Sequence, residues 1–171
     1  MVVHYMFSID KINELNRSEF IATFGNIFEK TDWIANKTFE LKPFKNIPDF
    51  VLKFTTIYEN SDHEKILEIL NSHPDLVVEQ KLTKESQKEQ NSANLNQCSE
   101  EELLEFTKLN KDYKNKFKFP FIIAVKGKNK NEILNIFKKR INNSTGEEFK
   151  EAKIQVKKIA IVRLDQIIKI N

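Results

Sequence analysis

The sequence predicts an all-α protein, a single-domain compact helical bundle of about eight helices with a short extended Phe-Pro-Phe segment. The 171 residues include only 3 Gly and 4 Pro, which disfavours a turn-rich β-sandwich. The hydrophobic share is 40% and Phe occurs 14 times, so the chain carries the material for a core. Apolar residues recur at helical spacing behind residues that favour helix starts. The length suits one domain over residues 1–171.

The first half of the chain predicts four helices. Ser18, Thr31, Pro48 and Ser61 are the expected starts, and the apolar stripes behind them span residues 20–28, 33–38, 51–57 and 66–70. Ser61 and Glu64 have the spacing of a capping box, in which each side chain accepts a hydrogen bond from the other residue's backbone N–H. Because Pro74 disfavours helical geometry in the residue before it, the fourth helix should end near His73.

The second half predicts four more helices and one apolar connector. The expected helices run from Thr83 to about Asn94, from Ser99 through Tyr113, from about Asn131 through Phe137, and from about Gly146 to Ile170. Residues 119–125 form a short apolar run, for which periodicity alone allows a buried strand or extended core chain. Pro120 argues against a central strand.

Composition narrows the function classes. The net charge is +3, and both signs alternate as on solvated helix faces, so neither nucleic acid nor a membrane is the expected partner. Cys98 is the single cysteine, which excludes an intramolecular disulfide and a cysteine-based zinc site. No two His have metal-ligand spacing, so no metal site is expected. The first ten residues lack a basic leader followed by a long apolar stretch, and we expect a cytoplasmic protein.

Arg163 falls within an apolar helix face. At about 100° per residue it lies in the middle of a stripe that includes Ala152, Val156, Ile159, Ala160, Ile167 and Ile170. A buried guanidinium is costly without a partner, so Arg163 requires a carboxylate. That carboxylate belongs either to a ligand, which the planar fork suits, or to a protein Asp or Glu in a structural pair.

Two other groups of residues are candidates for chemistry. Ser86, Glu89 and Gln90 share one helix face at i, i+3 and i+4, and the alternative is a solvated polar face. His73 lies at a fixed exit from a helix, since Pro74 restricts it. Histidine moves protons near neutral pH, and the alternative is a histidine that caps the helix end.

In order and spacing, these pieces resemble the OHCU decarboxylases (2-oxo-4-hydroxy-4-carboxy-5-ureidoimidazoline decarboxylases) of urate degradation. The resemblance covers nearly the whole chain, through short motifs that are specific only as an ordered set. The motifs are Phe24-Gly25, Glu29, Trp33, Lys42-Pro43-Phe44, His73-Pro74-Asp75-Leu76, Leu82-Thr83, Ser86, Glu89-Gln90, Leu109-Asn110, Tyr113, Phe117, Phe119-Pro120-Phe121-Ile122, Arg140, Glu147 or Glu148, Ile159-Ala160 and Arg163-Leu164. The sequence departs from the family pattern at Asn94 and Lys118, where glycine is usual.

The resemblance implies an all-helical homodimer that converts a small anionic ureidoimidazoline, OHCU, to (S)-allantoin and CO2 without a cofactor. It implies proton transfer by His73 with Glu89 as the second catalytic residue. The substrate-binding residues that it implies are Pro74, Ser86, Gln90, Phe121, Ile122, Ile123, Ala124, Val125 and Arg163.

The chemistry agrees with these assignments. Loss of CO2 leaves an electron pair that the unsaturated C–N system of the ring can accept, so no cofactor is needed as an electron sink. The protein must supply orientation, charge placement and one stereospecific proton. Two alternatives stay open: a non-catalytic or substrate-shifted relative of the same fold, and a helical interaction or nucleic-acid-binding module with a basic face.

Overall fold

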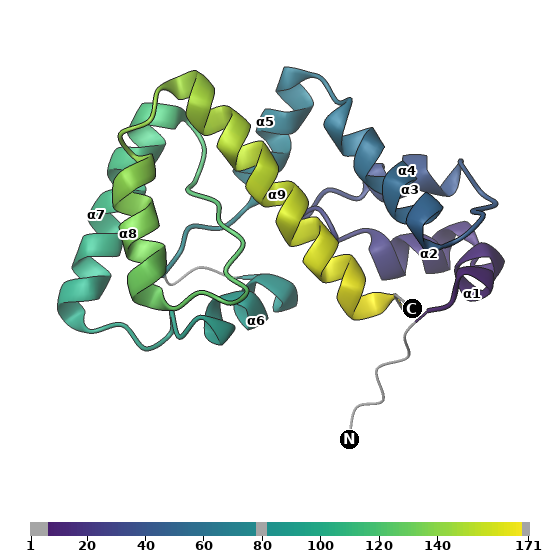
Figure 1. Cartoon of the computed structure of the whole chain (residues 1–171), viewed down its shortest axis with the longest axis horizontal. Helices are drawn as coiled ribbons and strands as arrows, with labels where there is room; N and C mark the ends of the chain where they lie inside the picture. Colours follow the sequence, from purple (N-terminus) through teal and green to yellow (C-terminus); the bar gives the residue numbers. More distant parts are fainter. Residues whose placement is uncertain (1–6, 78–81, 169–171) are drawn as a thin grey trace. The chain divides into compact units, whose positions relative to one another are not determined.

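The structure of the chain, a computed structural model, describes residues 7–77 and 82–168 (Figure 1). Within these two ranges the regular structure consists of nine α-helices and no β-strand, which confirms the predicted all-α class. The helices are α1 (Ile9–Glu14), α2 (Arg17–Phe24), α3 (Trp33–Phe39), α4 (Ile47–Glu59), α5 (His63–Ser72), α6 (Lys84–Ser92), α7 (Glu100–Phe117), α8 (Lys130–Arg140) and α9 (Thr145–Ile167). None of the helices in the described ranges is long and apolar enough to cross a membrane.

Side-chain caps explain where most of these helices begin. The predicted caps Thr83 and Ser99 are confirmed, because each side chain accepts a hydrogen bond from a backbone N–H three residues ahead. The start predicted at Ser18 is wrong, because Asn16 forms a capping box with Glu19. The start predicted at about Asn131 is close: α8 begins at Lys130, and Asn129 caps it and forms a capping box with Glu132.

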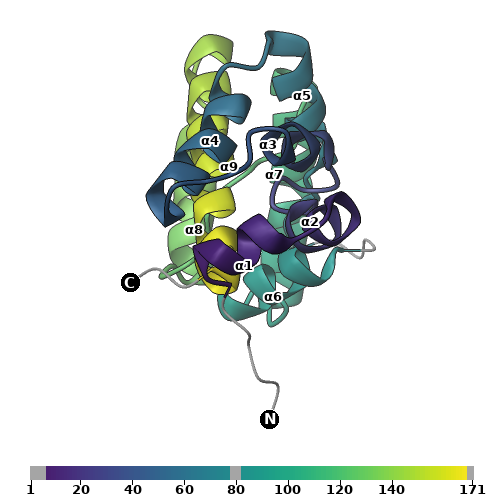
Figure 2. The ribbon, with the colours of Figure 1, turned by 90° about the vertical axis from the view of Figure 1, so that its right-hand side faces the viewer.

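By its internal contacts the chain divides into two compact units, Met1–Ile69 with Lys157–Asn171, and Leu70–Val156. The prediction of one domain over residues 1–171 stays a prediction. In the first unit α3 packs against α2 and α4 (Figure 2). Buried aromatic rings fill the core between these helices, with centroids 4.7–6.4 Å apart; they belong to Phe20, Phe24, Phe28, Phe44, Phe50, Phe54 and Tyr58.

In the second unit α7 lies beside α8 (Figure 1). The buried ring of Tyr113 contacts those of Phe117, Phe119, Phe121 and Phe137 at centroid distances of 4.5–5.9 Å. Residues 120–125 have no regular secondary structure, so the apolar run is extended core chain and not a strand. This packing holds the run that contains the predicted substrate-binding segment.

Candidate active site

His73 is the first residue after α5, as the sequence predicts. Its backbone N–H donates to the carbonyl of Leu70 at 3.2 Å, and its side chain is buried. Pro74 follows with a fixed φ, so the chain that leaves the helix has little freedom at this point. A buried imidazole at a constrained helix exit suits proton transfer to a bound molecule.

The three predicted polar residues of α6 share one face, and that face is turned inward. Ser86 is 4% exposed and Gln90 is 8% exposed, while Glu89 is half-buried. Their neighbours Lys84, Glu85, Gln87 and Lys88 are exposed. Since a solvated face would leave all of these side chains in water, the burial argues against that alternative for Ser86 and Gln90.

Gln90 joins α6 directly to the chain after His73. Its Nε2 donates to the carbonyl of Asp75 at 3.2 Å, and its Oε1 accepts from the N–H of Val77 at 3.1 Å. Val77 has φ 55°, a left-handed conformation that is costly for a β-branched residue. Such strain persists only where surrounding contacts impose it, and the Gln90 amide is one such contact. The structure therefore brings the two predicted catalytic segments into hydrogen-bonding contact.

Residues 121–125 are held through selected backbone groups. The Ile122 carbonyl accepts from Nη1 of Arg140 at 2.8 Å, and the Ala124 N–H donates to Oε1 of Gln155 at 2.9 Å. Among the described residues, none accepts a hydrogen bond from the N–H of Ile122, Ile123 or Val125. Buried backbone donors are nearly always paired in proteins, so these three suit a ligand that carries acceptors.

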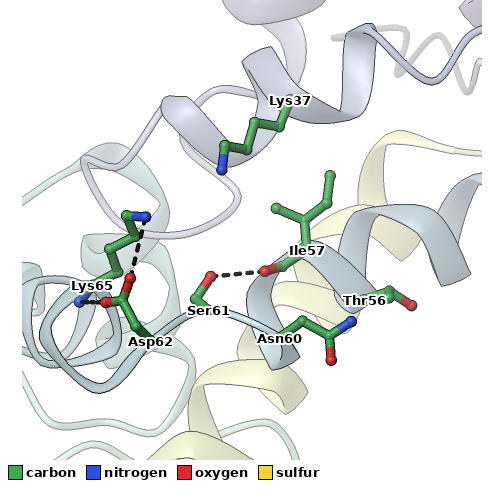
Figure 3. A pocket seen from close by; sticks show the side chains of 7 residues that line it. All are labelled: Lys37, Thr56, Ile57, Asn60, Ser61, Asp62 and Lys65. Carbon is green, nitrogen blue, oxygen red and sulfur yellow. Dashed lines mark hydrogen bonds and ion pairs between the residues drawn. The ribbon is translucent and has the colours of Figure 1, made fainter.

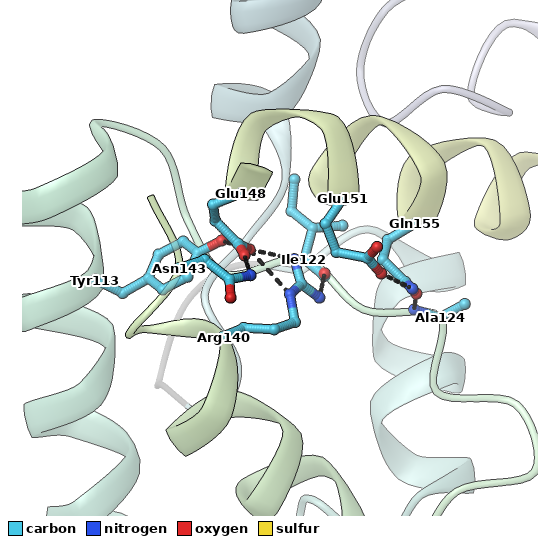
Figure 4. A network of polar contacts seen from close by, with 8 residues as sticks. All are labelled: Tyr113, Ile122, Ala124, Arg140, Asn143, Glu148, Glu151 and Gln155. Carbon is cyan, nitrogen blue, oxygen red and sulfur yellow. Dashed lines mark hydrogen bonds and ion pairs between the residues drawn. The ribbon is translucent and has the colours of Figure 1, made fainter. Parts of the chain in front are cut away.

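A buried polar network supports this segment (Figure 4). The Glu148 carboxylate accepts hydrogen bonds from Tyr113 and Arg140, and also from Asn143 at 2.7 Å. Burial, followed by the hydrogen bond to Glu148, raises the pKa of the Tyr113 hydroxyl, which therefore stays protonated and donates. A second branch fixes Gln155, whose Nε2 donates to Oε1 of Glu151 at 2.7 Å.

Arg163 belongs to the first compact unit, where it has a protein partner. Its Nη2 donates to Oε2 of Glu29 at 2.8 Å, and its Nη1 donates to the carbonyl of Asn26 at 3.1 Å. Both side chains of the ion pair are buried, at 3% and 1% exposed. The structure thus supplies the protein carboxylate that the sequence left as one of two alternatives, and substrate binding by Arg163 stays a prediction.

A family model described as OHCU decarboxylase matches residues 13–165. The chain belongs to the OHCU decarboxylase family. It is 37% identical over 162 residues to the "Uric acid degradation bifunctional protein" of Bacillus sp. (strain TB-90), covering 95% of the chain and 32% of that relative. It is 32% identical to the "2-oxo-4-hydroxy-4-carboxy-5-ureidoimidazoline decarboxylase" of Haloferax volcanii, covering 92% of the chain and 94% of that relative.

The chain thus spans about a third of the length of the Bacillus bifunctional relatives and nearly the whole length of the Haloferax volcanii relative. Among solved structures it resembles "Crystal structure of (S)-allantoin synthase", with a TM-score of 0.77 and 25% identity. That match covers 95% of the chain and 54% of the solved chain. The likeness agrees with the all-α fold.

The departures from the OHCU decarboxylase pattern at Asn94 and Lys118 fall at left-handed backbone positions. Asn94 has φ 57°, and Lys118, which ends α7, has φ 66°. Glycine adopts this conformation without strain, whereas asparagine is tolerated and lysine is less so. The left-handed backbone therefore explains why glycine is expected at these two positions, and this chain adopts the same conformation with asparagine and lysine.

Other residues of the second unit make contacts that sequence spacing does not disclose. Asn110 and Lys114 lie one helical turn apart on α7, and each bonds to the chain after His73. Gln155 is not among the predicted site residues, and its i, i+4 spacing from Glu151 is the sequence signal for its bond to that carboxylate. Within the described residues, no group of three or more His, Cys, Asp or Glu could bind a metal ion.

An open pocket of about 420 Å³ lies in the first unit (Figure 3). It is lined by Lys37, Thr56, Ile57, Asn60, Ser61, Asp62 and Lys65. Hydrogen bonds from the backbone and side chain of Lys65 lower the pKa of Asp62, which stays ionised and offsets one of the two lysines. Of the described residues that line this pocket, none is a predicted site residue.

Proposed function

We propose that the chain decarboxylates OHCU to (S)-allantoin and CO2 without a cofactor. One observation carries the proposal: the Gln90 amide bonds to the backbone of both Asp75 and Val77. This contact links the segment that bears His73 to the helix that bears Glu89 and Ser86. A proton-transfer site needs such fixed geometry between its acid and base groups.

The reaction breaks the bond between the carboxylate carbon and the ring carbon. The electron pair of that bond stays on the ring, where the unsaturated C–N system accepts it, and CO2 leaves. One proton then adds to the ring on a single face and gives (S)-allantoin. The protein contributes orientation of the carboxylate, exclusion of water and delivery of that proton.

His73 and Glu89 manage the proton. The burial of His73 and the half-buried position of Glu89 place both groups where water is partly excluded. Ser86, Gln90 and Pro74 shape the same side of the site. In this proposal Gln90 acts on the substrate mainly through the His73 segment, because both ends of its amide bond to that segment's backbone.

The ring of the substrate lies along residues 121–125. The N–H groups of Ile122, Ile123 and Val125 supply donors to its carbonyl and ring nitrogen acceptors. Phe121 and Ala124 belong to the same segment and contribute apolar side chains to it. Arg140 and Gln155 hold this segment rigid, so its donors cost little entropy to align.

Arg163 orients the substrate carboxylate. Its guanidinium is shared with Glu29, which offsets part of its charge. A weakened cation suits a decarboxylase, because tight binding of the carboxylate would stabilise the ground state more than the transition state.

We also propose a cytoplasmic homodimer, whose mass in solution can be measured by light scattering.

The experiment is stopped-flow circular dichroism on freshly generated OHCU, with CO2 release measured in parallel. The wild-type chain should accelerate formation of (S)-allantoin, whereas the uncatalysed reaction shows no stereospecificity. His73→Ala should abolish turnover with its far-ultraviolet spectrum unchanged, since one proton-transfer group contributes about 10²–10⁴-fold. His63→Ala is the matched control, because His63 is exposed at the start of the same helix.

Absence of acceleration by the wild-type chain would favour a non-catalytic or substrate-shifted relative instead. Retained turnover in His73→Ala would remove His73 from the mechanism while leaving the activity intact.

A further inference from the structure

We propose that Asn110 and Lys114 of α7 are positioning residues for His73, which they fix through the chain that directly follows it. The expected effect on turnover rests on the proposed function. The expected effect on the geometry of His73 rests on the contacts alone. We name the pair, with its bonds to residues 75 and 76, the α7 latch.

The α7 latch grips two consecutive residues from one helix face. Nδ2 of Asn110 donates to the carbonyl of Leu76 at 2.8 Å, and Nζ of Lys114 pairs with Oδ2 of Asp75 at 2.7 Å. The two side chains lie at i and i+4, so they share one face of the helix. One bond holds the backbone and the other holds a side chain, which together fix both the position and the direction of the segment.

The chain between α5 and the α7 latch is too short to absorb a displacement. The helix ends at Ser72, and only His73 and Pro74 separate it from Asp75. Pro74 has a fixed φ and restricts the conformation of His73. From α6, Gln90 holds the same segment through Asp75 and Val77. Release of the α7 contacts removes the hold from one of the two helices, so the backbone that carries the imidazole is less firmly fixed.

The burial of the ion pair is asymmetric. The Asp75 side chain is 9% exposed, whereas that of Lys114 is 45% exposed. Loss of Lys114 leaves the mostly buried Asp75 carboxylate without this cation and should lower the melting temperature, but less than the loss of a fully buried pair would, because water already reaches the ammonium group. The chain should therefore stay folded, with an altered geometry of the His73 segment.

Lys138 offers a matched control. Its ion pair with Glu105 at 2.6 Å has side chains that are 48% and 41% exposed, and Lys138 likewise lies on a helix of the second unit. The comparison uses Lys114→Met, Lys138→Met and the conservative variant Lys114→Arg. Asn110→Asp is added because it keeps the size of the side chain and removes the donor to Leu76.

Steady-state kinetics on OHCU test the catalytic consequence. Lys114→Met and Asn110→Asp should lower kcat about tenfold to a hundredfold with KM nearly unchanged, as misplacement of a catalytic group does. Lys114→Arg should recover most of kcat, and Lys138→Met should match the wild type. A merely structural role of Lys114 would lower the melting temperature of Lys114→Met and leave its kcat per folded molecule unchanged.

The ring signals of histidine in NMR spectra test the inference without activity. The chain has 3 His, so the His73 signal can be assigned with the His73→Ala variant. The signal should shift or broaden in Lys114→Met and Asn110→Asp but not in Lys138→Met. An unchanged His73 signal in both α7 variants would overturn the inference. A wild-type chain that does not process OHCU would overturn the proposed function alone, since the NMR result still decides the role of the latch.

Discussion

The described part of the chain contains two buried arginine–glutamate pairs, one in each compact unit, and they are completed in different ways. Arg140 and Glu148 are 8 positions apart, and Glu148 also accepts hydrogen bonds from Tyr113 and Asn143. Arg163 and Glu29 are 134 positions apart, and the backbone carbonyl of Asn26 takes another guanidinium hydrogen. The first pair bonds to further side chains, those of Tyr113 and Asn143, whereas the second bonds to backbone carbonyls of the segment before α3.

Burial of a cation therefore does not by itself identify a ligand site. The Arg140 guanidinium donates hydrogen bonds to Glu148 and to the Ile122 carbonyl, so its role is to hold residues 121–125. Arg163 has the same chemistry and similar burial, but it belongs to the family motif for which we propose carboxylate binding. Loss of Arg140 should therefore change mainly the free energy of unfolding. Loss of Arg163 should change mainly the affinity for the substrate.

The largest effect on stability is expected from Arg140→Met. This change leaves the fully buried Glu148 carboxylate without its cation and should lower the free energy of unfolding by about 3–5 kcal/mol. Urea denaturation followed by circular dichroism measures it. The double variant Arg140→Met with Glu148→Leu should recover part of the loss, because no unpaired buried charge remains. A loss below about 1 kcal/mol in Arg140→Met, the range of exposed pairs, would show that the network is not structural.

A smaller loss of stability and a larger change in affinity are expected from Arg163→Lys. Lysine keeps the charge but loses the planar fork, so one nitrogen must replace the two that bond to the Asn26 carbonyl and to Glu29. The free energy of unfolding should fall by about 1–3 kcal/mol. KM for OHCU should rise about tenfold, equivalent to ~1.4 kcal/mol, if the guanidinium also orients the substrate. An unchanged KM at normal folding would leave Arg163 with a structural role only.

The sequence predicts part of the local chemistry. Thr83 and Ser99 are the predicted caps of α6 and α7, and each cap bonds within its own first turn. The equally local capping boxes of Asn16 with Glu19 and of Asn129 with Glu132 were not predicted. The short helix α1 was missed, since among its six residues only Ile12 is buried and no apolar stripe is visible. The partner of Arg163 could not be identified from spacing, because Glu29 is brought to it by tertiary packing.

The same limit applies to the predicted site. The shared face of Ser86, Glu89 and Gln90 follows from helix periodicity, and it is partly buried as a functional face should be. The bonds from Gln90 to Asp75 and Val77 depend on how α6 meets a segment 13 to 15 residues away, which periodicity does not encode.

The smallest effect is expected from Lys118→Gly. Lys118 lies where the chain leaves α7 and leads into the segment that Arg140 holds. Lys118 has φ 66° at the end of α7, a conformation that costs a residue with a Cβ about 1 kcal/mol. Glycine there should raise the free energy of unfolding by about that amount, with residues 121–125 unmoved. Lys111→Gly is the matched control, because this exposed lysine lies within α7, where glycine should cost about 1 kcal/mol. Opposite signs in urea denaturation would show that the position, and not the residue type, determines the effect. A loss of stability in both variants would mean that the Lys118 side chain, through its bond to the Asn115 carbonyl, contributes more than its backbone strain costs.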